Sequence, residues 1–129
     1  MGSDKKIIVQ RGAKLIVDGG RITNLFEDKY WRGIIVHGNA TKEQPNVDDV
    51  LEPDDSGVVY ITNSQIVFAE QAIRASGEGV LSYAEQKARW GGLIVAEDSQ
   101  FYNNKVAAGF MKYDFSNKSR FINLSLIHI

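Results

Sequence analysis

The densest group of potential metal ligands lies in one acidic stretch, residues 39–56, NATKEQPNVDDVLEPDDS. Carboxylate oxygens in a flexible loop are ligands that Ca²⁺ prefers. The spacing does not match the D-x-D-x-D-G pattern of a calcium loop, and a solvated insertion explains the charges equally well. We therefore predict no metal site and no cofactor, with Ca²⁺ kept as the alternative. The carboxylates concerned are Asp48, Asp49, Glu52, Asp54 and Asp55.

Three further carboxylates, Asp18, Glu97 and Asp98, lie near the ends of apolar segments. A glycosidase needs two carboxylates across a sugar, one as the acid and one as the base or nucleophile. The competing explanation is that Asp98 occupies a turn, where its side chain bonds the local backbone. A lyase would use a basic residue, and the sequence suggests no convergent basic pair. We expect the turn role and predict no catalytic residue.

Aromatic and histidine side chains offer two other kinds of site. Trp31 and Trp90 precede a glycine in WRG and WGG, and an exposed indole can stack on a sugar ring. We predict these two tryptophans as ligand-binding residues; the alternative is that they cap the core where a loop rejoins the fold. His37 follows GIIV and is expected to point outward at a strand end. A single histidine is a poor metal site.

The overall composition is that of one folded domain. The chain has 129 residues and a formal net charge of −1, with 43% hydrophobic and 24% charged residues. A near-neutral charge gives no electrostatic footprint for nucleic acid, and no apolar stretch is long enough to predict membrane insertion. Cysteine is absent, which excludes disulfides and thiolate chemistry.

An internal repeat is the strongest pattern in the chain. GVVYITNSQIVFAEQAI (57–73) recurs further along the chain as GGLIVAEDSQFYNNKVAA (91–108), and AKLIVDGGRITN (13–24) is an earlier copy. Apolar residues alternate with period two in each copy, as in strands. A small or polar set, Gly19, Asn63 and Asp98, marks a turn between two strands. The matched apolar sets are Leu15, Val59 and Ile94; Val17, Ile61 and Ala96; Ile22, Ile66 and Phe101; and Ile34, Ile73 and Ala108.

Short strands with matched inward positions predict a stack of repeating coils. No coil can bury its own apolar side, whereas stacking builds a continuous core. Each rung would contain three strands, so the predicted fold class is all-β: a three-sided parallel β-helix of about three rungs. A sandwich or barrel is the alternative, but it needs hairpin turns. The recurrent Asn24, Asn63, Asn103 and Asn123 are expected to support turns.

The domain boundaries follow from the repeat. Residues 1–6 are a predicted disordered start, and residues 7–123 are the β-helix domain. Two insertions, 39–56 and 78–90, both follow the third strand of a rung and should emerge from one edge; SYAEQKARW (82–90) could form a short helix. Residues 124–129, LSLIHI, can be encoded by a sequencing-library adapter, so we interpret them as a non-native tail of a truncated fragment. A natural strand is the alternative for this tail.

Four segments resemble a known group of proteins. GAKLIVDGGRITN, YWRGIIVHGNA, GVVYITNSQIVFAEQAIRASG and GGLIVAEDSQFYNNKVAAGFMKY are similar to right-handed parallel β-helix repeats of large secreted or cell-surface proteins of Bacteroidetes-type bacteria, which are often type IX secretion substrates. The resemblance implies an extracellular or cell-surface location and further β-helix rungs in the parent protein.

The resemblance also implies a class of function. We expect an extracellular structural or adhesion scaffold whose partner is a polysaccharide or a cell surface. The alternative is a fragment of a polysaccharide lyase or glycoside hydrolase of the β-helix type. A scaffold needs only a regular face, whereas an enzyme needs carboxylates or a base converging on one cleft.

Overall fold

The alternating strands form three parallel sheets in the computed structural model, which describes residues 5–24, 29–77 and 82–127. We name them sheets A, B and C. Sheet A contains β1 (Lys6–Val9), β4 (Gly33–Val36), β7 (Gln71–Ala75) and β10 (Val106–Phe110). Sheet B contains β2 (Lys14–Asp18), β5 (Val58–Thr62), β8 (Leu93–Glu97) and β11 (Arg120–Ile122). Sheet C contains β3 (Arg21–Ile22), β6 (Gln65–Val67), β9 (Gln100–Tyr102) and β12 (Ser125–Ile127).

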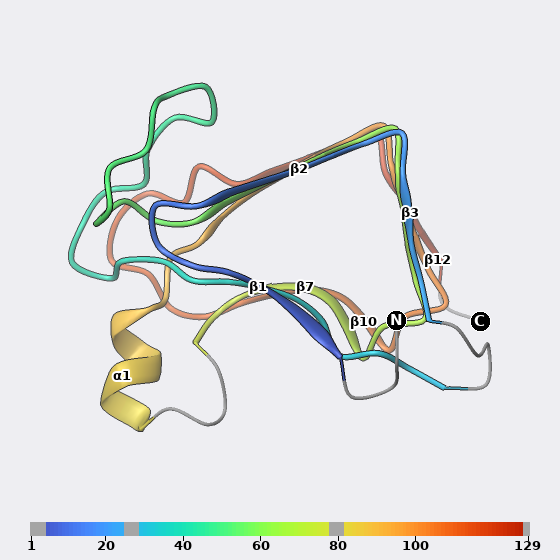
Figure 1. Cartoon of the computed structure of the whole chain (residues 1–129), viewed down its shortest axis with the longest axis horizontal. Helices are drawn as coiled ribbons and strands as arrows, with labels where there is room; N and C mark the ends of the chain where they lie inside the picture. Colours follow the sequence, from blue (N-terminus) through green and yellow to red (C-terminus); the bar gives the residue numbers. More distant parts are fainter. Residues whose placement is uncertain (1–4, 25–28, 78–81, 128–129) are drawn as a thin grey trace.

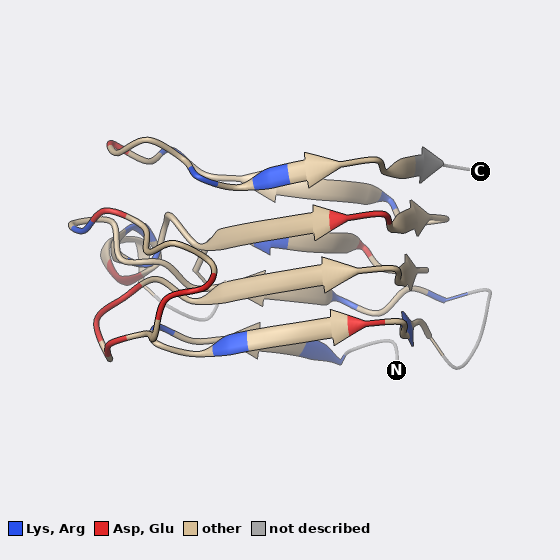
Figure 2. Cartoon of the chain, turned by 90° about the horizontal axis from the view of Figure 1, so that it is seen from above, with Lys and Arg blue, Asp and Glu red and all other residues tan. Residues whose placement is uncertain are grey.

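The chain visits the sheets in the constant order A, B, C, and we call one such pass a tier. Each sheet therefore takes its strands from successive tiers, and the strand pairings in the described ranges are parallel. Figure 1 shows the three sheets as the sides of a triangle, and Figure 2 shows the tiers stacked between the two chain ends. The predicted all-β class with parallel strands is confirmed.

The predicted register is also confirmed. Leu15 pairs with Val59, which pairs with Ile94. The same ladder relates Ile22, Ile66 and Phe101 in sheet C. Ile34 pairs with Ile73, which pairs with Ala108, in sheet A. Like side chains therefore meet along the stack, as the repeat predicted.

The number of tiers, four rather than about three, differs from the prediction. β1 begins at Lys6, inside the segment expected to be a disordered start. β10 lies in the predicted repeat, but β11 was not recognised because the spacing changes: Arg120 follows its partner Val95 by 25 residues, whereas Ser99 follows Ser64 by 35. Ser125–Ile127, in the predicted tail, pair with β9 as a strand. Their origin stays a prediction, and His128 lies outside the described residues.

The apolar core lies between the three sheets. Its middle tiers are sealed: Ile61, Ile66, Ile73 and Ile94 have no exposed surface. Residues of the first and last tiers, such as Leu15 and Ala108, pack on this core but stay partly exposed, because only one neighbouring tier covers them. Apolar side chains at the centre of the stack therefore gain the most stabilisation from burial, because each is covered by a tier on both sides.

The corner between sheets B and C is a column of left-handed residues. Gly19, Asn63, Asp98 and Asn123 have φ values of 74°, 48°, 50° and 52°. Only glycine, asparagine and aspartate adopt this conformation readily. The backbone N–H of each of the first three donates to a carbonyl of the next tier, with Gly19 N to Thr62 O at 3.1 Å. Asp98 thus has the turn position predicted for it.

Buried serines reinforce the same corner. The hydroxyl of Ser64 accepts from the Gly20 N–H at 3.1 Å and donates to the Thr62 carbonyl at 2.7 Å. Ser99 repeats the arrangement one tier later, accepting from the Ser64 N–H and donating to the Glu97 carbonyl. Each hydroxyl therefore accepts from a backbone N–H of the preceding tier and donates to a carbonyl of its own turn.

Both predicted insertions, as far as they are described, lie at the corner between sheets A and B (Figure 1). The backbone N–H groups of Gly38 and Ala40 donate to the carbonyls of Arg89 and Ala88, which ties one insertion to the other. The short helix expected in 82–90 is present as α1 (Tyr83–Ala88), capped by Ser82, whose hydroxyl accepts from the Glu85 N–H. No helix in the described ranges has the length and apolar character required to cross a membrane.

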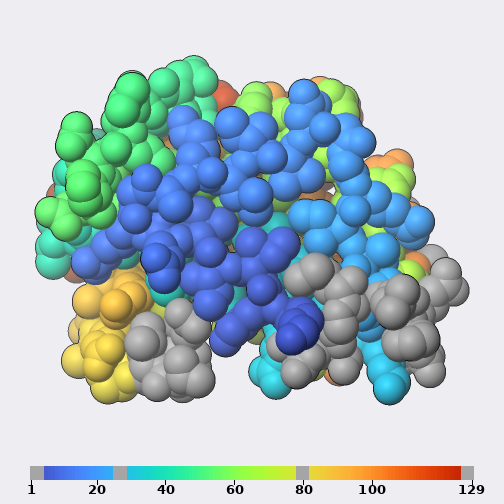
Figure 3. All heavy atoms as spheres, in the orientation of Figure 1, coloured from blue at the N-terminus to red at the C-terminus, as the bar shows by residue number. Residues whose placement is uncertain are grey.

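The 39–56 insertion is exposed at Asp48, Asp49 and Asp54, but part of it packs on the sheets. Val47 and Leu51 pack on Val58, Leu93 and Val95, on the outer side of sheet B. Figure 3 shows this segment, in green, gathered at one corner beside the first tier. The sequence did not predict this packing, because Val47 and Leu51 are only two side chains in a segment of eighteen residues that is rich in acids.

The core column can be tested with one substitution at two depths. Ile61→Ala is expected to lower the free energy of unfolding by about 2–5 kcal/mol, because it removes a fully buried side chain between two tiers. Ile16→Ala removes the same atoms from a side chain that is 62% exposed in the neighbouring strand and should cost much less. Urea unfolding followed by circular dichroism measures both; equal losses would contradict the stacked core.

The turn column can be tested at Asn63. Asn63→Gly should leave the unfolding midpoint nearly unchanged, because glycine accepts a φ of 48°. Asn63→Val should cost about 1–2 kcal/mol, because a β-branched residue is strained there. Thermal unfolding of the two variants distinguishes these outcomes, and a well-tolerated valine would argue against the left-handed turn.

Candidate functional site

An open groove of about 660 Å³ lies on the outer side of sheet A. Its cationic residues come from different tiers: Lys6, Arg32, Arg74 and Lys105. Glu70 is the carboxylate in the lining. We call this surface the basic groove; its remaining lining residues are Ile35, Gln71 and Val106.

The strand register explains how the groove is built. Ile35 pairs with Arg74 and is only 2% exposed, so it forms an apolar floor beneath the charged side chains. Lys6 pairs with Gly33, and Arg32 is held beside it because its backbone N–H donates to the Lys5 carbonyl at 2.8 Å. Gln71 pairs with Val106 on the other side of the groove. Ile35 and Arg74 alternate with the core residues Ile34 and Ile73, so their side chains face outward.

Arg32, Arg74 and Lys105 keep most of their charge available to a ligand. Within the described part of the chain, neither Arg32 nor Arg74 forms an ion pair with its side chain. The Lys105 ammonium lies 4.9 Å from the centre of the Tyr30 ring, a cation–π contact that holds it near the groove without neutralising it. The groove therefore carries more positive than negative charge and can attract an anionic ligand.

The sequence did not reveal this groove. Each tier contributes one basic residue, and long segments separate them, so no run of charge appears. The register of β1 would have indicated the groove. Lys6 pairs with Gly33, which places it beside Arg32, and in the next pair of strands Arg74 pairs with Ile35. The expectation that no basic residues converge is wrong, because folding brings together residues from four tiers.

The two tryptophans predicted to bind a ligand are buried instead. Trp31 has no exposed surface, its indole N–H donates to the Val67 carbonyl at 2.9 Å, and its backbone bridges to Ala69. Trp90 is 9% exposed and packs edge-on against Tyr83 at 6.4 Å between ring centres. Neither ring presents an open face for stacking on a sugar, so the geometry favours the alternative that both cap the core.

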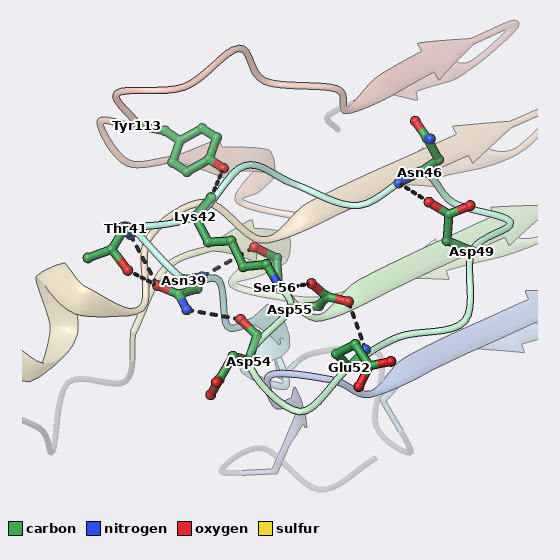
Figure 4. A network of polar contacts seen from close by, with 10 residues as sticks. All are labelled: Asn39, Thr41, Lys42, Asn46, Asp49, Glu52, Asp54, Asp55, Ser56 and Tyr113. Atoms are coloured by element: carbon green, nitrogen blue, oxygen red, sulfur yellow. Dashed lines mark hydrogen bonds and ion pairs between the residues drawn. The ribbon is translucent and has the colours of Figure 1, made fainter.

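The acidic stretch uses its carboxylates to close its own loop (Figure 4). Asp55 is almost buried, binds the Lys42 ammonium and accepts from the Glu52 N–H at 2.7 Å. Asp49 accepts from the Asn46 N–H at 3.2 Å. No three acidic or histidine side chains meet as a metal site requires, within the ranges that the structure describes. The calcium alternative gains no support from this geometry.

The carboxylates considered for glycoside cleavage are each engaged between tiers. Asp18 accepts from the Thr62 hydroxyl at 3.0 Å, and Asp98 accepts from the Asn123 amide at 2.6 Å. Glu97 forms an ion pair with Arg120 at 3.1 Å and accepts from the Tyr60 hydroxyl at 3.3 Å. Burial first, and then the charge of Glu97, raises the pKa of Tyr60. These contacts give all three carboxylates a structural role.

His37, expected to point outward at a strand end, is covered rather than exposed. His37 is 4% exposed, its backbone N–H donates to the Val9 carbonyl, and its own carbonyl accepts from Gly57. The loops that meet at this corner cover it. Its neighbour Gly38 lies so close to Gly91 that an added Cβ would stand 2.3 Å from backbone, so the chain is tightly packed here.

The predicted asparagines divide into two structural roles. Asn63, Asn103 and Asn123 take left-handed turn conformations. Asn24 is buried and its amide donates to the Lys29 carbonyl at 2.7 Å. Sequence reasoning missed Asn104, which is 4% exposed, accepts from the Ala69 N–H at 2.7 Å and donates to the Ile66 carbonyl at 3.0 Å.

Comparisons of the chain with protein families, with curated proteins and with solved structures found no match. The candidate site therefore stands on its own geometry and charge.

The Lys42–Asp55 pair predicts how the 39–56 loop responds to acid. The hydrogen bond from Lys42, and then that from the Glu52 N–H, lowers the pKa of Asp55 below its ordinary value of 3.8. The contribution of this pair to folding is therefore present above pH 3.8 and is lost as the pH falls through the lowered value. Hydrogen exchange of the loop, corrected for intrinsic rates, should rise in that acid range.

A matched pair of variants isolates the effect. Asp55→Asn should expose the loop amides to exchange already at pH 7, because it removes the charge that binds Lys42. Asp48→Asn removes the same charge from an exposed position of the same loop and should leave exchange unchanged at pH 7. An Asp55→Asn loop as protected as that of the unsubstituted chain would refute the anchoring role.

Proposed function

We propose that this chain is a right-handed parallel β-helix module that serves as a structural or adhesion scaffold in an exported bacterial protein and contacts carbohydrate through the basic groove. The support for the β-helix is the constant order of the sheets, which repeats in register along the stack. The support for a right-handed coil is general: crossover connections between parallel strands take this hand in about 98% of cases.

A scaffold role accounts for how the polar groups are used. Asp18, Glu97 and Asp98 hold neighbouring tiers together, and Asp55 closes a loop. These bonds stiffen the stack and leave its outer face regular. A stiff, regular face can present repeated weak contacts to a long partner, which suits adhesion better than it suits catalysis.

The basic groove is the observation that carries the carbohydrate contact. The 39–56 loop packs on the outer side of sheet B through Val47 and Leu51. The outer side of sheet C is narrow and carries a hydrogen bond between Gln65 and Gln100 at 2.8 Å. Sheet A has the open groove of about 660 Å³, lined by side chains that donate and accept hydrogen bonds.

The proposal predicts binding without cleavage. Affinity electrophoresis in gels that contain a soluble polysaccharide should retard the chain; hydroxyethyl cellulose, xylan and polygalacturonate are suitable probes. Light scattering of each polysaccharide after prolonged incubation should show an unchanged molar mass. Migration unaffected by all three polymers would overturn the carbohydrate contact.

The same experiment decides between a scaffold and the enzyme alternative. A fall in the molar mass of any polymer, abolished by Glu97→Gln or by Asp98→Asn in a chain that still folds, would establish a lyase or hydrolase in place of the scaffold. Asp54→Asn, at an exposed loop position, is the control for a nonspecific loss.

A further inference from the structure

The cations of the basic groove are distributed along the stack, one from each tier. Lys6 opens β1, Arg32 stands immediately before β4, Arg74 lies in β7 and Lys105 stands immediately before β10. Neighbouring parallel strands are about 4.8 Å apart, so these positions span roughly 14 Å along the stack axis. The register staggers these cations along the strand direction, because Lys6 lies level with Gly33 whereas Arg74 lies level with Ile35. The groove thus presents a staggered row of positive charge across the strands.

A row of this kind selects for a ligand that repeats its negative charge. A small anion would use only one or two of the cations. A linear polymer with an acid group on successive units could meet several at once, and each added contact would raise affinity without a deep pocket. Because Arg74 is half-buried above Ile35, its guanidinium is partly shielded from water, which strengthens its pull on a carboxylate.

The rest of the lining distinguishes between polyanions. Single-stranded nucleic acid is normally bound on aromatic side chains that stack with bases, and the groove lining contains none. Glu70 and Gln71 instead offer acceptors to hydroxyl groups, which sugars carry in number. The combination of cations with hydroxyl acceptors matches a sugar acid better than a phosphate backbone.

We infer that the basic groove binds an acidic polysaccharide, a polymer of carboxylate-bearing sugars, which lies along the stack and crosses all four strands of sheet A. This inference rests on the proposed carbohydrate contact and names its ligand class. Arg32 and Arg74 form the central charged contacts, and Glu70 with Gln71 receives the hydroxyl groups.

The test compares polygalacturonate with its fully methyl-esterified form, which has the same backbone without charge. Isothermal titration at low salt should give at least tenfold tighter binding to the acid form. Binding should weaken as salt is raised from 20 to 200 mM, because screening shortens the reach of surface charges.

Charge-matched variants locate the contact. Arg32→Gln with Arg74→Gln should weaken binding of polygalacturonate by about tenfold or more. Arg21→Gln with Lys87→Gln removes the same charge from exposed positions on sheet C and α1 and should change it by less than about twofold. Glu70→Gln should tighten binding, a gain that loss of folding cannot imitate.

Each outcome decides one of the two proposals. Equal binding of both polymers, indifferent to Arg32 and Arg74, would overturn the acidic ligand and leave the carbohydrate contact standing. Binding of neither polymer would overturn both. Tighter binding of single-stranded DNA of equal charge than of polygalacturonate would assign the groove to nucleic acid and refute the inference.

Discussion

Parallel pairing in register between successive tiers is the constraint on which the rest of the structure depends. Because the strands of one tier pair with those of the next, the backbone groups are satisfied along the stack and equivalent side chains fall on top of one another. Leu15, Val59 and Ile94 meet for this reason, and so do Gly19, Asn63 and Asp98. One register therefore sets the core, the turns and the spacing of every outward side chain.

Two corners of the coil meet this constraint in different ways. The corner between sheets B and C is short and repeats its chemistry, with a left-handed residue followed by a small one in the first three tiers. The corner between sheets A and B accepts insertions, because the chain leaves and rejoins the stack there. Gln44 illustrates its packing: it is 2% exposed, donates to the Gly91 carbonyl and accepts from the Lys118 N–H, so it joins three segments.

In this arrangement only the outward side chains, which alternate with those of the core, can contact a partner. The carboxylates at strand ends bond from tier to tier, and the tryptophans close the interior. What remains open is the outer side of sheet A, where Ile35 forms the floor and Arg32 and Arg74 supply charge. Charges on successive strands of a sheet favour an extended ligand over a small one.

The sequence by itself determined the strands, their parallel register and the left-handed turn residues, because each depends on local patterns that the repeat displays several times. The short helix and the common corner of the insertions followed from the same pattern. It did not determine the strands at the two ends of the stack, since β1 precedes the first recognisable copy and β11 follows at a different spacing.

Only the tertiary structure decided the burial of Trp31 and His37, the packing of Val47 on sheet B and the convergence of Lys6, Arg32, Arg74 and Lys105. Each of these depends on which distant segment covers or adjoins a residue. That information lies in the packing between tiers, and no local pattern of side chains carries it.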